Sequence, residues 1–278
     1  MNNLIQFHNT SRAFHGRDAV RNLNLTVPEG SIYAFLGPNG AGKTTTIHMM
    51  LGILRPTSGH VTVFGQDSQK LRPSDKCRIG YVSENQRLPM WMKVREFLAY
   101  CRPFYPTWDD PFSQALVRQF NLPPERKLKA LSRGMLGKLA LASVLSYRPS
   151  LLVLDEPFSG LDPLVRHEFI QGVLELIGQE KWTVFISSHD MDEVERLCDH
   201  VGIIANGQLM ANEAISDLQN RFREVTFHSD PINPPPPQLP PHWMNLQTSS
   251  RLVRFVHAHF DETSLPTEIL QIAPTAQA

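Results

Sequence analysis

Short apolar runs alternate with helix-length segments along most of this sequence. The runs SIYAFLG, SLLVLDEP and WTVFISS have the composition of strands, and segments long enough for helices lie between several such runs. Strands that alternate with helices are typical of an α/β fold in which helices cover a parallel sheet. The pattern therefore predicts an α/β domain with a largely parallel, buried central sheet.

Two regions depart from this alternation. Residues 1 to about 35 read as antiparallel strands separated by turn residues. Residues from about 88 to 150 read as wholly helical, with the segments KVREFLAYCRPFY, DDPFSQALVRQF and SRGMLGKLALASVLSY. We interpret the second region as a helical subdomain inserted between two halves of the α/β core.

The composition changes abruptly at PINPPPPQLPP, residues 231–241. Consecutive prolines exclude helix and central strand, so this stretch predicts an extended spacer, with a ligand for a proline-binding domain as the alternative. We expect a main domain over 1–220, a proline-rich connector over 221–241 and a small C-terminal appendix over 242–278. Within the appendix, SRLVRFVHAHF predicts a strand and SLPTEILQI a short helix.

Charge and cysteine content narrow the class of protein. The formal net charge is zero, which does not indicate a nucleic-acid binder with a basic surface. Cys77, Cys101 and Cys198 are scattered and form no CxxC pair, as expected for thiols in a reducing cytosol. No secretion leader opens the sequence, and its apolar runs are too short to span a bilayer. Work at a membrane would therefore require a partner.

The stretch GPNGAGKTT fits the phosphate-loop pattern GxxxxGK[ST] and lies between a predicted strand and a predicted helix. Such a loop directs backbone N–H groups and a helix N-terminus at phosphate groups. Lys43 would reach the β- and γ-phosphates, and the Thr44 hydroxyl would bind Mg²⁺. The candidate ATP-binding residues in this stretch are Gly37, Pro38, Asn39, Gly40, Ala41, Gly42, Lys43, Thr44 and Thr45.

Two acidic residues end the apolar run LLVLDEP. Asp155 at the strand end is placed to hold Mg²⁺ through water, and the carboxylate of Glu156 is placed to polarise an attacking water. A strand that merely ends on two solvated acids is the alternative. The phosphate loop more than a hundred residues upstream favours the functional interpretation.

The remaining motifs resemble those of the ATP-binding cassette (ABC) ATPases, a family of P-loop NTPases. LSRGM resembles the family signature LSGGQ, SGLD, which ends at Asp162, resembles the D-loop, and SSHD has His189 at the switch histidine position. Phe14 stands where the family has an aromatic residue that stacks on adenine. The resemblance covers roughly residues 1–220.

This resemblance implies an ABC cassette with an antiparallel β subdomain and a helical subdomain that carries the signature. It also implies that two cassettes pack head to tail around two ATP molecules. The phosphate loop, Asp155, Glu156 and His189 of one cassette would face Ser132 and Gly134 of the other. ATP hydrolysis would then open the dimer and drive a membrane partner.

Two residues depart from the family pattern. The third signature residue is Arg133 rather than glycine, and we expect its side chain to point outward, where it could pair with the partner cassette or with phosphate. Glu84 stands where the family usually has a glutamine that contacts Mg²⁺; a glutamate can still bind Mg²⁺ but adds negative charge near the phosphates. Both features resemble the branch of cassettes that serve exporters of the ABC-2 type.

The leading hypothesis is the ATPase subunit of a bacterial-type ABC transporter, peripheral at the cytoplasmic face of the inner membrane. Its expected partners are integral membrane permease subunits and a second cassette, in a homodimer, and no nucleic acid. An aromatic-rich stretch, LPMWMKVREFLAYCRPFYPTW, would receive the permease or would form the helical core. The alternatives are a soluble ABC ATPase that acts on nucleic acid or ribosomes, and a regulatory cassette of a heterodimer.

Overall fold

The computed structural model describes residues 2–160, 166, 170, 172, 182–191, 197–228, 240, 243–249, 252–258, 260, 261 and 263–272. The chain divides into two units, Met1–Asn212 and Glu213–Ala278. The boundary falls before residue 220 because helix α8 (Ile215–Arg221) belongs to the second unit. Arg221 pairs with Glu213 at 2.5 Å, and its carbonyl accepts a hydrogen bond from Phe260 N at 2.9 Å.

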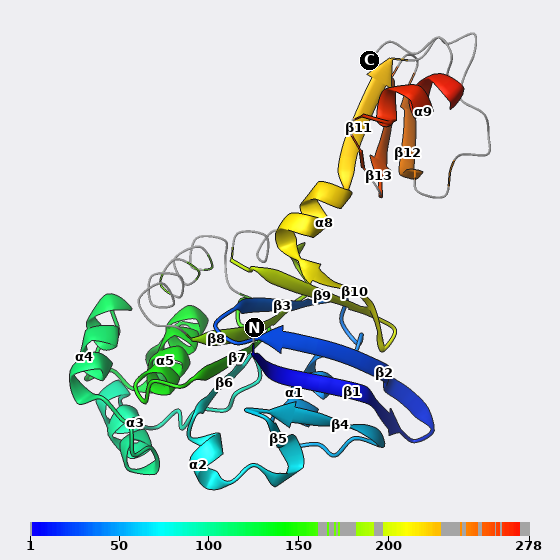
Figure 1. The fold of residues 1–278 in the computed structure, drawn as a ribbon. Coiled ribbons are helices and arrows are strands. Elements are labelled where there is room, and N and C mark those ends of the chain that lie inside the picture. The colour runs from blue at the N-terminus through cyan, green and yellow to red at the C-terminus, as the bar shows by residue number, and fades with distance from the viewer. Residues whose placement is uncertain are drawn as a thin grey trace. The chain divides into compact units, whose positions relative to one another are not determined.

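A six-stranded sheet forms the centre of the first unit, with the order β10-β9-β3-β8-β7-β6 (Figure 1). The pairs β3–β8, β3–β9, β7–β8 and β6–β7 are parallel, as the alternation of strands and helices predicts. Every residue of β7 and β8 is buried, which explains their continuous apolar runs. The strands are β3 (Ile32–Leu36), β6 (Ile79–Ser83), β7 (Leu151–Asp155), β8 (Thr183–Ser188), β9 (His200–Ala205) and β10 (Gln208–Ala214).

A second, antiparallel sheet of the first unit has the order β2-β1-β4-β5. Its strands are β1 (Asn3–Phe14), β2 (Arg17–Pro28), β4 (Ser58–Val63) and β5 (Gln66–Asp67). The prediction of antiparallel strands at the N-terminus is correct for β1 and β2, and β4 joins them from later in the chain. Helix α1 (Lys43–Met50) contacts β2 and β4 of this sheet and β7 of the central sheet, so one apolar core serves both sheets.

The helical region predicted between residues 88 and 150 contains α3 (Val94–Cys101), α4 (Asp110–Gln119) and α5 (Arg133–Leu145) (Figure 1). Side-chain oxygens of the preceding residues, Asp109 and Ser132, cap α4 and α5. The short helices are η1 (Ser68–Lys70), α2 (Pro73–Lys76), η2 (Arg102–Phe104) and η3 (Leu128–Ala130). Among the described residues, no helix is long and apolar enough to cross a bilayer.

All three cysteines are separate thiols in the described structure. Burial raises the pKa of Cys101 to about 11 and that of Cys198 to about 12. Both thiols therefore stay protonated at neutral pH and are poor nucleophiles.

The second unit contains a three-stranded antiparallel sheet with the order β11-β13-β12. Its strands are β11 (Arg223–His228), β12 (Trp243–Ser249) and β13 (Leu252–His257), and helix α9 (Leu265–Ile272) contributes Ile269 to the same core. The predicted connector over 221–241 is therefore wrong at its start, where β11 alternates exposed and buried residues with the period of a strand. The prolines of 231–241 lie outside the described residues, except Pro240.

A polar contact inside this second core predicts a large effect on stability. Glu268 Oε1 accepts a hydrogen bond from Trp243 Nε1 at 2.9 Å, and its Oε2 lies 3.1 Å from Nε2 of His257, which is 4% exposed. We expect Glu268→Ala to lower the free energy of unfolding by about 1–3 kcal/mol, because it takes an acceptor from two buried ring nitrogens. Urea denaturation measures the loss, and Glu268→Gln, which keeps one acceptor oxygen, should lose less. Equal stability of all three proteins would contradict this account.

Candidate nucleotide-binding site

The loop between β3 and α1 has a backbone that requires glycine. A Cβ on Gly37 would lie 2.2 Å from the carbonyl oxygen of Ile204. Gly42 has φ of 109°, and a Cβ there would lie 2.5 Å from the carbonyl oxygen of Ala19. Gly40 also has a positive φ, of 81°. The glycines let the loop fold closely against its neighbours, with Gly37 N donating to the carbonyl of Ser188 at 3.2 Å and Ala41 N to that of Pro38 at 3.1 Å. A backbone without side chains lets an anion approach closely.

Helix α1 begins directly after this loop. Its N-cap, Gly42, makes no side-chain hydrogen bond to the first turn, and the first turn contains no acidic residue. The N–H groups there are available to an anion, which the helix dipole also favours. A cavity of about 240 Å³ lies here, lined by Ala19, Asn39, Gly40, Gly42, Lys43, Thr44, Thr45, Glu84 and Glu156.

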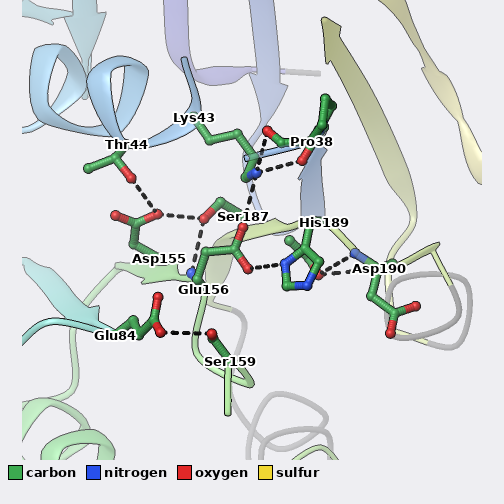
Figure 2. A network of polar contacts seen from close by, with 12 residues as sticks. Pro38, Lys43, Thr44, Glu84, Asp155, Glu156, Ser159, Ser187, His189 and Asp190 are labelled. Atoms are coloured by element: carbon green, nitrogen blue, oxygen red, sulfur yellow. Dashed lines mark hydrogen bonds and ion pairs between the residues drawn. The ribbon is translucent and has the colours of Figure 1, made fainter. Parts of the chain in front are cut away.

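Lys43 is the buried cation of the site, with 5% of its surface exposed. Its Nζ donates to the carbonyl oxygens of Gly37 at 2.5 Å and Pro38 at 3.1 Å, and it lies 3.0 Å from Glu156 Oε1 (Figure 2). A buried ammonium held by two carbonyls and a carboxylate is in place for an anionic ligand, because a phosphate can replace the carboxylate as its partner.

Asp155 ends strand β7 beside the first turn of α1 and is 3% exposed. Its Oδ1 accepts hydrogen bonds from Ser187 Oγ at 2.6 Å and Thr44 Oγ1 at 3.3 Å (Figure 2). The adjacent parallel strands β3, β7 and β8 end at one edge of the sheet and bring these groups together. Ser187 was not predicted as a site residue, although the serines of SSHD were a signal for it.

The groups at this sheet edge that could bind a metal are hydroxyl and carboxylate oxygens, which are suitable ligands for Mg²⁺. No group of three or more His, Cys, Asp or Glu side chains that could hold a metal is found among the described residues. Thr44 and Asp155 alone supply too few ligands for an octahedral ion. These residues therefore suit a cation whose remaining ligands would be phosphate oxygens and water.

Glu156 and His189 form a pair next to the lysine. Glu156 Oε2 lies 2.8 Å from His189 Nδ1, and the backbone N of Glu156 donates to Ser187 Oγ at 3.0 Å (Figure 2). Glu156 has φ of 51°, a left-handed conformation that is strained for a residue with a side chain. A carboxylate fixed in this way at a polar cavity can accept a proton from water.

Glu84 lies on the other side of Glu156, after strand β6. Its Oε1 accepts a hydrogen bond from Ser159 Oγ at 2.7 Å (Figure 2) and pairs with Arg133 Nη2 at 3.0 Å. The partner of Arg133 in this chain is thus Glu84, the other residue that departs from the ABC pattern. Pairing of Arg133 with a second cassette or with phosphate, which the sequence allows, stays a prediction.

Three further predicted site residues, Phe14, Ser132 and Gly134, are not among the described residues that line the cavity. Phe14 ends β1, is 40% exposed and has the Arg12 guanidinium 4.6 Å from its ring centroid. Ser132 caps α5, where its Oγ accepts from Met135 N at 3.2 Å, and Gly134 is buried in the first turn. Asp162 lies outside the described residues.

A glycine loop between a parallel strand and a helix, a buried lysine, and an acidic strand end beside it define a P-loop nucleotide-binding protein. Residues 20–159 match the family described as ABC transporter, and the chain belongs to this family. It is therefore an ABC ATPase with an α/β cassette fold, as the motifs predicted.

Curated relatives agree with this assignment. The bacitracin transport ATP-binding protein BcrA of Bacillus licheniformis is 35% identical over 226 residues, which cover 81% of this chain and 74% of BcrA. The Nod factor export ATP-binding protein I of Burkholderia lata is 35% identical over 216 residues, 76% of this chain and 70% of the relative. Both are named as ATP-binding proteins of transport or export.

Solved structures show the same fold. CbiO1 from Clostridium perfringens, part of the ABC transporter complex cbiONQ, superposes with a TM-score of 0.69 at 23% identity. The match covers 79% of this chain and 91% of CbiO1. MJ1267, an ATP-binding cassette in its ADP conformation, also has a TM-score of 0.69, at 24% identity, and covers 80% of this chain and 95% of MJ1267.

Proposed function

We propose that this chain hydrolyses ATP at a site shared between two cassettes and thereby drives export through separate membrane subunits. The observation that carries the proposal is the convergence of Lys43, Glu156 and His189 at the phosphate loop. Lys43 to Glu156 is 3.0 Å and Glu156 to His189 is 2.8 Å. The signature residues Ser132 and Gly134 lie away from this loop, as they must if they serve a partner's nucleotide.

Each residue then has a chemical role. Lys43 binds the β- and γ-phosphates, and Glu156, released from the lysine, accepts a proton from the attacking water. His189 holds the Glu156 carboxylate through Nδ1. Thr44 and Asp155 hold Mg²⁺, which when bound neutralises charge on the phosphates. The contacts Thr44–Asp155, Lys43–Glu156 and Glu156–His189 already bring these groups together.

The second half of the site comes from another copy of the chain. Ser132 and the N–H groups at the beginning of α5 bind the γ-phosphate of the partner's ATP, again an anion at a helix N-terminus. The resemblance to the family assigns a nucleotide contact to Asp162 and stacking on adenine to Phe14. The two nucleotides are the main link between the copies, so hydrolysis opens the dimer.

The membrane partner is an integral permease, and the chain is peripheral at the cytoplasmic face of the membrane. Names of relatives such as the Nod factor export protein support export as the direction. The helical subdomain supports a docking role because Trp91 is 69% exposed, Phe104 60% and Tyr100 54%. Trp91 and Tyr100 line one groove with apolar neighbours.

A pair of substitutions at Ser132 tests the shared site. Aspartate and asparagine cap a helix about as well as serine does, so both should keep α5 intact. Only aspartate places a negative charge opposite the partner's γ-phosphate. We expect Ser132→Asp to lower kcat at least about tenfold relative to Ser132→Asn, with unchanged ATP affinity of the single subunit. Equal turnover in the two variants would contradict a shared site.

A further inference from the structure

The pair Glu84–Arg133 joins three segments of the first unit that are far apart in the sequence. Glu84 follows β6, and its backbone N donates to the carbonyl of Asp155 at 3.0 Å. Its carboxylate binds Ser159, in the turn after Glu156, and Arg133, the first residue of α5. The ion pair therefore links the segment that carries the catalytic carboxylate to the signature helix.

Arg133 has a defined position beside that turn. A Cβ added to Gly160 would lie 2.0 Å from Nη1 of Arg133, so the guanidinium packs against bare glycine backbone. Gly160 also has a positive φ, of 66°. Gly160 thus leaves the space that the Arg133 guanidinium occupies, and a larger residue at position 160 would displace the arginine.

The ion pair contributes little to stability. The side chain of Arg133 is 59% exposed and that of Glu84 is 30% exposed, and ion pairs exposed to this extent usually add little to the free energy of unfolding. A structural role therefore does not explain why two departures from the family pattern contact each other. The charges of the two residues and the position of Glu84 at the phosphate cavity explain this contact.

Charge at the phosphate cavity explains the pairing better. Among the described residues that line the cavity, Lys43 is the cation and Glu84 and Glu156 are anions. Asp155 adds a third carboxylate through its contact with Thr44. ATP brings several more negative charges, so a carboxylate at position 84 without a counter-ion would repel the phosphates.

We propose that Arg133 is a positioning and charge-compensating residue for Glu84. It neutralises this carboxylate and holds it, together with Ser159, beside the phosphate cavity, so that the site tolerates glutamate where the family has a neutral glutamine. This inference rests on the proposed nucleotide site. It assigns to a signature residue a role in the nucleotide site of its own chain.

Equilibrium binding tests the proposal without turnover. In the full-length Glu156→Gln background, the dissociation constant of a fluorescent ATP analogue with Mg²⁺ is measured for four proteins: the background alone, with Arg133→Gln, with Glu84→Gln, and with both. We expect Arg133→Gln to weaken binding by about threefold to tenfold, from one uncompensated charge at a partly solvated site. The double variant should bind within about twofold of the background protein, because the two positions together carry no net charge in either protein.

Two controls separate charge from structure. Arg133→Lys keeps the positive charge and should bind nearly as well as the background protein, and added salt should shrink the Arg133→Gln effect. A loss that persists in the double variant would mean that Arg133 acts only through the structure of α5, which overturns the proposal. Unchanged binding in Arg133→Gln would overturn it too. The background protein is measured in the same series. If it binds nucleotide, the proposed nucleotide site stands, and a failure of the Arg133 proposal can be told apart from a failure of that site.

Discussion

Glu156→Gln is expected to bind ATP and to hydrolyse it at least about 100-fold more slowly than the parent protein. Glutamine keeps the size of the side chain, and its backbone N can still donate to Ser187, which lies 3.0 Å away. The amide cannot accept a proton from water, so the chemical step loses the base that we propose. Steady-state phosphate release gives the rate, and equilibrium binding of a fluorescent ATP analogue gives the affinity.

Glu125→Gln is the matched control for this variant. Glu125 is an exposed carboxylate that pairs with Lys93 and Arg95. Its loss removes the same charge from the chain at a distance from the phosphate loop, and turnover should stay at the parent value. Hydrolysis by Glu156→Gln at the parent rate would show that another group is the base.

Lys43→Met is expected to weaken ATP binding by about 30-fold to 1,000-fold, as for other truncated partners of buried charge pairs. Methionine preserves most of the buried stem and removes the ammonium that contacts Gly37, Pro38 and Glu156. Without it, the carboxylate of Glu156 faces the phosphates with no cation between them. Isothermal titration with ATP and Mg²⁺ measures the change.

The folded state of the lysine variant is checked by its urea denaturation curve. Lys129→Met is a matched control, because Lys129 lies in the short helix η3 (Leu128–Ala130), away from the loop. The control should bind ATP with the affinity of the parent protein. Retained affinity in a folded Lys43→Met protein would exclude the phosphate-loop assignment.

The central sheet and the phosphate loop could be predicted from the sequence because both depend on local signals. β7 is buried on both faces and therefore reads as a continuous apolar run. Gly37 and Gly42 stand where any side chain would meet a carbonyl oxygen, so the backbone itself requires them. The helical subdomain could also be predicted, because its segments between residues 88 and 150 are of helix length and interrupt the series of strands.

Features that depend on long-range packing could not be predicted in this way. Strand β4 looks like the other strands, yet it pairs with β1 in the antiparallel sheet. Arg133 and Glu84 are 49 residues apart, and no local pattern indicates that they pair. Ser187 was missed because a buried serine becomes informative only when the strand ends place its hydroxyl 2.6 Å from Asp155.

The start of the second unit was misplaced for a related reason. The prolines after residue 230 dominate the composition, whereas β11 carries only two buried apolar residues, Val225 and Phe227. A strand this short can be recognised only from its antiparallel pairing with β13.

The most direct test of the account is the molecular mass of Glu156→Gln in solution, measured by light scattering with and without ATP and Mg²⁺. We expect a monomer without nucleotide and a dimer with it, because in the proposed shared site ATP links the phosphate loop of one copy to Ser132 of the other. A monomer under both conditions, with ATP bound, would contradict a site shared between two copies of this chain.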